Sequence, residues 1–145
     1  SGLIDLGGDV CIVGPHPDGS PWLVGIRDPR DPERAMASLP LSHGSLATSG
    51  DYERFMEIDG KRYCHLLNPR TGWPITGIAG VSVVADQCLV AGTATTIAML
   101  KGHSGARWLE KLGLPYLLLD ENRRTGGSLW PTRTPRNQSP ETQPS

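Results

Sequence analysis

Cysteine, phenylalanine and long apolar runs are all scarce in this 145-residue sequence. Its three cysteines, Cys11, Cys64 and Cys88, are too few and too scattered for a disulfide framework or a zinc site, and we expect them to be small buried residues. No apolar run approaches the roughly 20 residues that span a bilayer. An excess of one charge is also lacking: the formal net charge is −1, which gives no electrostatic reason to expect binding to nucleic acid or to an anionic membrane surface.

Two common nucleotide-binding motifs are absent as well. The sequence has no P-loop, and no Rossmann glycine fingerprint follows a first strand, so a nucleotide here would not be bound in the Rossmann manner. No secretory signal is visible, but the chain opens abruptly at an expected strand, and we therefore expect a portion of a longer protein. The length suffices for one domain with a real core, which we place at residues 1–130.

Short apolar runs separated by turn residues predict mainly strands in the first half. The expected strands are Leu3–Leu6, Val10–Val13, Trp22–Ile26 and Leu39–Thr48. Gly7-Gly8-Asp9 lies between the first two and is either a glycine interruption of one strand or a tight bend between two strands. The charged, proline-containing segment Arg27–Arg34 is predicted to be a surface connection.

The second half combines strands with helices. Ile78–Ala85 is rich in β-branched residues and predicts a buried strand, and Asp86 is positioned to cap a helix over about Cys88–Leu100. Gly102 should end that helix.

A second helix should open at Ser104 or Gly105 and stop at Gly113, before a strand at Pro115–Leu119. The predicted fold class is therefore α+β, with a mixed or antiparallel sheet and a helical pair near the C-terminus. Residues 131–145 contain no large apolar residue and are predicted to be a disordered tail.

The densest group of turn, aromatic and polar residues lies at 45–76. Asp59-Gly60 separates the runs Glu53–Ile58 and Arg62–Leu67 and predicts a β-hairpin. The second strand leads through His65 into Asn68-Pro69-Arg70-Thr71-Gly72, a turn in which Pro fixes φ and Gly can take a positive φ. An imidazole beside such a turn can hold a phosphate or a carboxylate. Judged alone, a histidine at a strand end is more often structural, and Arg70 is equally compatible with a solvated loop charge.

The motifs Thr48–Arg54 and Tyr63–Gly72 resemble the ApbE family, and the resemblance extends to Ile4–Asp9 and Ala91–Thr96, over roughly residues 3–120. Members of this family are FAD:protein FMN transferases, which move FMN from FAD to a Thr or Ser of a partner protein and release AMP. The resemblance implies an ApbE-like fold and the same activity here, with this chain as the C-terminal portion of such a protein.

The resemblance also implies a flavin site. In the family, the His-x-x-Asn-Pro-Arg-Thr-Gly turn lines the flavin cleft, which implies that His65 is the catalytic residue and that FAD is contacted by His65, Leu66, Leu67 and Asn68. The family shares this site with an upstream stretch that includes a Gly-Tyr-Ala segment. That stretch is absent from this sequence, so we expect the chain to hold part of the pocket.

A departure from the family pattern concerns magnesium. Residues 92 and 96 lie four apart on a helix and share a face. ApbE-like proteins generally have Asp at the position of Gly92, Thr at that of Thr96 and, in some members, a second Asp at that of Thr95. The resemblance implies Mg²⁺ held by Thr96 and Thr95, weakened by the missing carboxylates. Without the resemblance, the segment is a Thr- and Ala-rich helix that packs closely on the sheet.

Partners and location are likewise implied by the resemblance. The acceptor would be a flavoprotein subunit of a membrane electron-transport complex, and the protein would act in the periplasm, often as an inner-membrane lipoprotein whose anchor lies outside this sequence; a cytoplasmic location stays open. One alternative is a non-catalytic flavin-binding or assembly module that has lost the metal. Another is an FAD pyrophosphatase, which needs the same metal and is weakened by the same Gly92.

Overall fold

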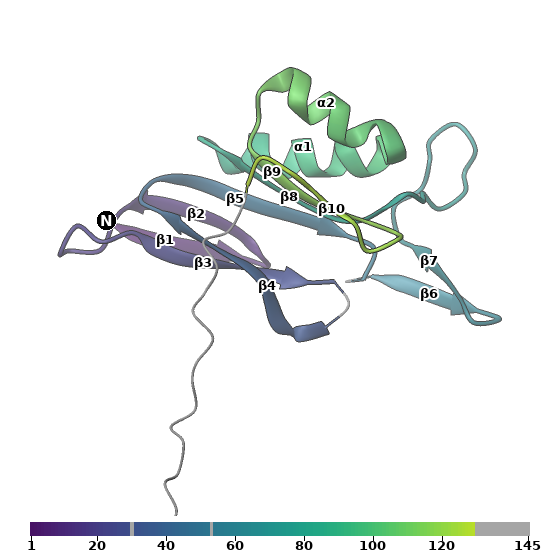
Figure 1. Ribbon diagram of the computed structural model, residues 1–145, viewed down its shortest axis with the longest axis horizontal. Helices are drawn as coiled ribbons and strands as arrows, with labels where there is room; N and C mark the ends of the chain where they lie inside the picture. The colour runs from purple at the N-terminus through teal and green to yellow at the C-terminus, as the bar shows by residue number, and fades with distance from the viewer. Residues whose placement is uncertain (30, 53, 130–145) are drawn as a thin grey trace, which may run out of the picture.

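A six-stranded antiparallel sheet forms the centre of the molecule, in the spatial order β1-β2-β5-β8-β9-β10 (Figure 1). The structure is a computed structural model and describes residues 1–29, 31–52 and 54–129. The six strands are β1 (Gly2–Leu6), β2 (Asp9–Gly14), β5 (Gly44–Gly50), β8 (Ile78–Ala85), β9 (Tyr116–Asp120) and β10 (Thr125–Gly127). Two separate two-stranded sheets are formed by β3 (Trp22–Asp28) with β4 (Asp31–Leu41) and by β6 (Phe55–Ile58) with β7 (Lys61–Cys64).

Two helices cover one face of the sheet. α1 (Cys88–Lys101) is followed by a 3₁₀ turn (Gly102–Ser104) and by α2 (Gly105–Leu112). Their apolar residues meet those of β8 and β9 in a cluster formed by Ile78, Val81, Val83, Ala94, Ala98, Met99, Leu109, Tyr116 and Leu118. Because side chains alternate along a strand, Tyr116 and Leu118 face the helices while Leu117 faces the other way.

The β3–β4 ribbon covers the opposite face, so the molecule has three layers (Figure 1). The second core cluster is formed by Val10, Ile12, Val24, Ile26, Ala37, Leu39, Leu46 and Leu117. Helices on one side and a β-ribbon on the other confirm the predicted α+β class with an antiparallel sheet and a helical pair.

The two glycines after β1 form a tight turn between two strands. Gly7 and Gly8 have φ values of 69° and 98°, and Leu6 pairs with Asp9 across the turn. The Asp5 carboxylate accepts a hydrogen bond from the Gly8 N–H at 2.8 Å. Of the two alternatives for this segment, the tight bend is therefore the one adopted, and it places Asp9 at the first position of β2.

Two of the predicted strand boundaries were wrong. The predicted strand Leu39–Thr48 is divided between β4 and β5, because the chain turns at Ser42 and His43 and Gly44 has a φ of 87°. The predicted surface connection Arg27–Arg34 is largely strand, since β3 continues to Asp28 and β4 begins at Asp31. A two-stranded ribbon leaves one edge of each strand unpaired and so accommodates proline, as at Pro40. β10 was not predicted.

The helix boundaries follow the prediction except at the N-cap. Gln87 is the N-cap of α1 and makes no side-chain capping bond, so the predicted capping role of Asp86 is wrong by one residue. Gly102 and Gly113 end the two helices as predicted. In the described part of the chain, no helix combines the length and the apolar character needed to cross a bilayer. The predicted tail at 131–145 lies outside the described residues, and the domain boundary at 130 stays a prediction.

Candidate functional site

The β6–β7 hairpin, which leads into His65 and the turn at Asn68–Gly72, projects away from the main sheet (Figure 1). Asp59 and Gly60 form its turn with φ values of 51° and 72°, the two positive values that a type I′ hairpin turn requires. Strand pairing runs from Ile58 opposite Lys61 to Phe55 opposite Cys64, which confirms the hairpin predicted from Asp59-Gly60.

The turn after β7 is held by its own side chains. The Asn68 side-chain oxygen accepts from the Arg70 N–H at 2.9 Å, and the Asn68 carbonyl accepts from the Gly72 N–H at 2.8 Å. Gly72 has a φ of 72°, as the sequence predicts. The Asn68 N–H donates to the Trp73 carbonyl at 2.8 Å and closes the loop. The turn is therefore a rigid, polar element that starts three residues after His65.

His65 is exposed, and its Nδ1 has two neighbours, the carbonyl oxygen of Arg54 and, at 3.9 Å, Sγ of Cys64. Nδ1 lies 3.0 Å from the carbonyl oxygen of Arg54, which can only accept, so Nδ1 carries the proton when the ring is neutral. The backbone N–H of His65 donates to the same oxygen at 3.1 Å. Nε2 is consequently the nitrogen that can take up a proton.

An apolar cavity of about 660 Å³ adjoins His65. The side chains that give it this character are Phe55, Met56, Ile58, Leu67, Trp73 and Pro74. Several are unusually exposed for their type, with Trp73 at 70 % and Met56 at 62 %. The volume is within the range of cofactor pockets, and the lining suits a planar, largely apolar ring. Of the predicted flavin contacts, His65 and Leu67 line this cavity, whereas Asn68 lines a smaller one of about 380 Å³ beside the C-terminal end of α1.

The predicted metal-binding residues lie on α1, where it packs on β5. Thr95 is fully buried; its hydroxyl donates to the Gly92 carbonyl at 2.8 Å and accepts from the Ser49 hydroxyl at 2.9 Å. Thr96 is half-buried, and its hydroxyl donates to the same carbonyl at 3.1 Å. The Thr95 hydroxyl therefore serves to join helix and strand, and Thr96 has the freer lone pairs. A ligand role for either residue stays a prediction.

A carboxylate from another strand lies beside Gly92. A Cβ atom built on Gly92 would be 3.5 Å from Oδ2 of Asp9, at the start of β2, and 3.9 Å from Cβ of Ala47. Asp9, Ser49, Gly92 and Thr96 all line one cavity of about 620 Å³. Cys88 lies there too, and burial, with a smaller contribution from the neighbouring Asp9 charge, raises the pKa of its thiol.

This donor set suits magnesium better than a transition metal. In the residues that the structure describes, no three side chains among His, Cys, Asp and Glu gather as a metal site. One carboxylate beside a hydroxyl, in an open cavity, is a set that Mg²⁺ accepts, because Mg²⁺ is usually held by one or two carboxylates together with substrate phosphates and water. The residues present therefore fit the ion that the sequence implies, provided that the carboxylate comes from outside α1.

The residues around His65 and those around α1 are connected through β5. β5 supplies Ser49 to the α1 site and ends at Gly50, and four residues later the Arg54 carbonyl orients His65. No hydrogen bond links His65 to Thr95 or Thr96 within the described ranges.

Comparison with known proteins identifies the family of the chain. The sequence model of the ApbE family matches residues 1–118. The chain belongs to the ApbE family. Its sequence is 32% identical over 121 residues to the FAD:protein FMN transferase of Vibrio cholerae, and the match covers 81% of this chain and 36% of that protein.

Solved ApbE structures share the fold. The crystal structure of the ApbE protein of Thermotoga maritima superposes with a TM-score of 0.79 at 34% identity, over 88% of this chain and 42% of that one. The apo flavinyl transferase ApbE of Pseudomonas stutzeri gives 0.72 at 33% identity, over 87% and 40%. The chain spans about a third of the length of the curated relatives it matches.

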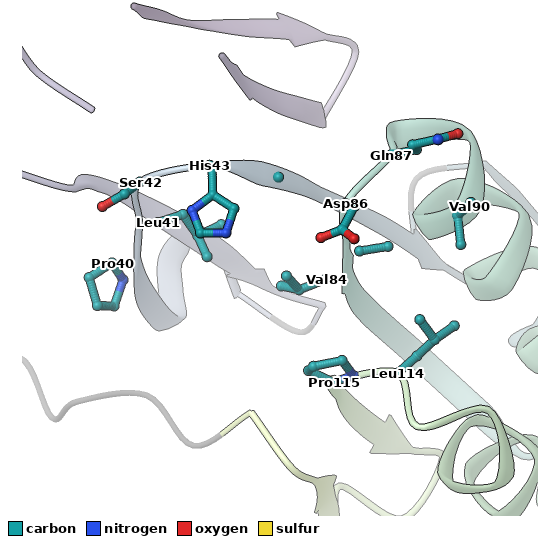
Figure 2. A pocket seen from close by; sticks show the side chains of 12 residues that line it. Pro40, Leu41, Ser42, His43, Val84, Asp86, Gln87, Val90, Leu114 and Pro115 are labelled. Atoms are coloured by element: carbon teal, nitrogen blue, oxygen red, sulfur yellow. The ribbon is translucent and has the colours of Figure 1, made fainter. Parts of the chain in front are cut away.

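A further cavity of the ApbE chain contains none of the predicted site residues. It measures about 660 Å³ and lies between the β4–β5 turn and the junction of β8 with α1. Figure 2 shows His43 on one side and the Asp86 carboxylate turned toward it from the other. No sequence signal marked His43, and Asp86 was singled out only as a helix cap.

Proposed function

We propose that the protein is, or is part of, an FAD:protein FMN transferase that uses Mg²⁺. The observation that carries this proposal is the position of His65, whose Nε2 is left as a proton acceptor beside an apolar cavity and a rigid polar turn. The family membership and the names of the relatives support the same activity.

The chemistry is a transfer of a phosphoryl-linked group. The hydroxyl oxygen of an acceptor Thr or Ser attacks the FMN-side phosphorus of FAD, a new P–O ester bond forms, and the P–O bond to AMP breaks. The attacking hydroxyl loses its proton. His65 Nε2 is the group suited to accept it, and such general-base assistance contributes typically ~10²–10⁴-fold to a rate.

The turn at Asn68–Gly72 and the apolar cavity beside His65 would bind different parts of FAD. The exposed aromatic and aliphatic side chains beside His65 would stack on a ring of FAD, and the polar turn at Asn68–Gly72 would face its diphosphate. FAD should therefore bind more tightly than FMN, and riboflavin more weakly still.

Mg²⁺, when bound, would neutralise charge that develops on the pyrophosphate. Thr96 is the residue of α1 best placed to contribute an oxygen, with Thr95 behind it in the packed helix–strand contact. We also propose a periplasmic location, a lipid anchor outside this sequence, and an acceptor subunit of a membrane electron-transport complex, which are family expectations.

The proposal is tested by incubating the intact protein with FAD and a Thr-bearing acceptor peptide, with Mg²⁺ or with EDTA. The expected result is flavin fluorescence on the peptide and one AMP released per label, in Mg²⁺ only. Binding of FAD without transfer at any Mg²⁺ concentration would favour the non-catalytic flavin-binding module. Release of free FMN and AMP without labelling would favour the pyrophosphatase. Equal affinity for riboflavin and FAD would contradict recognition of the diphosphate.

A further inference from the structure

We infer that Asp9 supplies the carboxylate that α1 lacks, so that a divalent cation is held between β2 and α1 by Asp9 and Thr96. The site is thus formed by two elements more than 80 positions apart in the sequence. The choice of Mg²⁺ as the physiological cation rests on the proposed function, whereas the position of the carboxylate rests on the geometry of this chain.

The Asp9 carboxylate lies beside the point where a side chain at position 92 would begin. Oδ2 lies 3.5 Å from the point where a Cβ of residue 92 would begin, on the cavity side of the helix. An acidic side chain on the helix would project from that point into the same cavity. Asp9 therefore brings a carboxylate oxygen to the region that an Asp at position 92 would reach.

Asp9 is held in place by the backbone, while its carboxylate is left without a protein partner among the described residues. Gly7 and Gly8 fix the hairpin turn, and the pairing of Leu6 with Asp9 sets the register in which β2 begins. Asp9 is half-buried, and in the part of the chain that the structure describes its carboxylate makes no hydrogen bond or ion pair. A half-buried carboxylate without a protein partner requires water or a cation to satisfy its oxygens.

The surroundings of the Asp9 carboxylate include a second oxygen ligand. Thr96 presents a hydroxyl oxygen to the same cavity, and its proton is already donated to the Gly92 carbonyl. The lone pairs of that hydroxyl are thus directed away from the hydrogen bond and are available to a cation. One carboxylate and one hydroxyl leave most of an octahedral shell to water and to substrate phosphate, which is how Mg²⁺ is commonly bound.

The test measures cation binding without flavin. Mn²⁺, which also prefers oxygen ligands, is titrated into the intact protein and followed by electron paramagnetic resonance, with Mg²⁺ as competitor. Asp9→Asn should weaken Mn²⁺ binding by about tenfold or more, since even the loss of an outer-shell partner of a metal ligand costs ~10–100-fold. Asp86→Asn is the matched control. It also removes one carboxylate charge near the start of α1, but Asp86 lines a different cavity.

A reciprocal exchange locates the carboxylate. The double variant Asp9→Asn, Gly92→Asp should recover most of the lost affinity, since it moves the carboxylate from the strand to the helix. Gly92→Asp alone should bind Mn²⁺ more tightly than the unchanged protein. This variant tests the inference even if Asp9→Asn fails to fold.

Four results would overturn the inference: no Mn²⁺ binding at millimolar concentrations, unchanged binding in Asp9→Asn, equal losses in Asp9→Asn and Asp86→Asn, or a folded double variant without recovery. Because flavin is absent from these titrations, failure of FMN transfer leaves the inference standing. Conversely, Mg²⁺-dependent transfer that is insensitive to Asp9→Asn would uphold the proposed function and contradict this site.

Discussion

At the scale of single residues, the surroundings of His65 favour a chemical role over a structural one. Its ring is exposed, its Nδ1 is held by a backbone carbonyl, and it contributes little to either core cluster. A residue of this kind can be removed without loss of the fold, which makes its chemical role separable from its structural one.

His65→Ala should lower FMN transfer by about 10²-fold or more and weaken FAD binding, because both the proton acceptor and one wall of the cavity are lost. The melting temperature should change little. Flavin titration, peptide labelling and thermal melts on the same preparation measure these effects, and His43→Ala, an exposed histidine of another cavity, is the control. A large fall in melting temperature with unchanged flavin affinity of the protein that stays folded would assign His65 a structural role.

Gly92 tests the electrostatics of the same region without any flavin. In EDTA, Gly92→Asp should lower the melting temperature, because the new carboxylate adjoins Asp9 and like charges repel; added salt should reduce the loss. With Mg²⁺ the sign should reverse, since two carboxylates bind the ion more tightly than one and ligand binding stabilises the folded state.

Gly92→Asn is the matched control for that experiment, because it adds nearly the same atoms without charge. Gly92 has no positive φ, and a Cβ there meets only ordinary contacts, so both variants are sterically allowed. Equal melting temperatures of the two variants in EDTA would show that no carboxylate lies beside position 92.

At the scale of elements, the contact between α1 and β5 depends on a short hydrogen-bond chain. Ser49 donates to Thr95, and Thr95 donates to the Gly92 carbonyl, so the two hydroxyls tie the strand to the helix inside the packed layer. Thr95 is 0 % exposed, so its hydroxyl is satisfied by protein partners.

Thr95→Val should lower the free energy of unfolding by about 0.5–1.5 kcal/mol, the net contribution of a hydrogen bond, because the half-buried Ser49 hydroxyl loses its protein acceptor. Urea unfolding measures it. Thr93→Val, on the exposed side of the same helix, should change stability by less than about 0.5 kcal/mol. Equal effects at both positions would mean that intrinsic helix preference, rather than the Ser49–Thr95 contact, accounts for the loss.

At the scale of the whole molecule, stability comes from two apolar clusters on opposite faces of one sheet. The helix-side cluster depends on α2 through Leu109, which is fully buried. α2 reaches the sheet only because α1 and the turn at Gly102–Ser104 bring it there, so its burial is a property of the assembled layers.

Leu109→Ala should lower the free energy of unfolding by about 2–5 kcal/mol, because it leaves a cavity in the helix-side cluster. Leu112→Ala on the same helix removes the same atoms from a residue that is 51% exposed and should cost under about 1 kcal/mol. Chemical denaturation of both variants is the measurement. Similar losses of unfolding free energy in the two variants would contradict the packing of α2 on the core through Leu109.

The elements that could be predicted are those whose causes are local. The Asp59-Gly60 hairpin, the β8 strand and the helix stops at Gly102 and Gly113 follow from turn chemistry and β-branched composition within a few residues. The strand division at Ser42 and His43 was missed although Gly44, with a φ of 87°, is a local turn signal, and the pairing of β5 with β2 and β8 sets where the new strand begins.

The candidate site divides in the same way. By itself, the sequence determined the turn that follows His65, the absence of a carboxylate at Gly92 and the position of Thr96 one turn later on the same helix, since each depends on near neighbours. Only the tertiary structure decided which nitrogen of His65 is protonated, that the Thr95 hydroxyl accepts a hydrogen bond from Ser49, and that Asp9 lies beside Gly92. These contacts join residues from separate elements, and their distances are set by sheet register and layer packing, which no local pattern records.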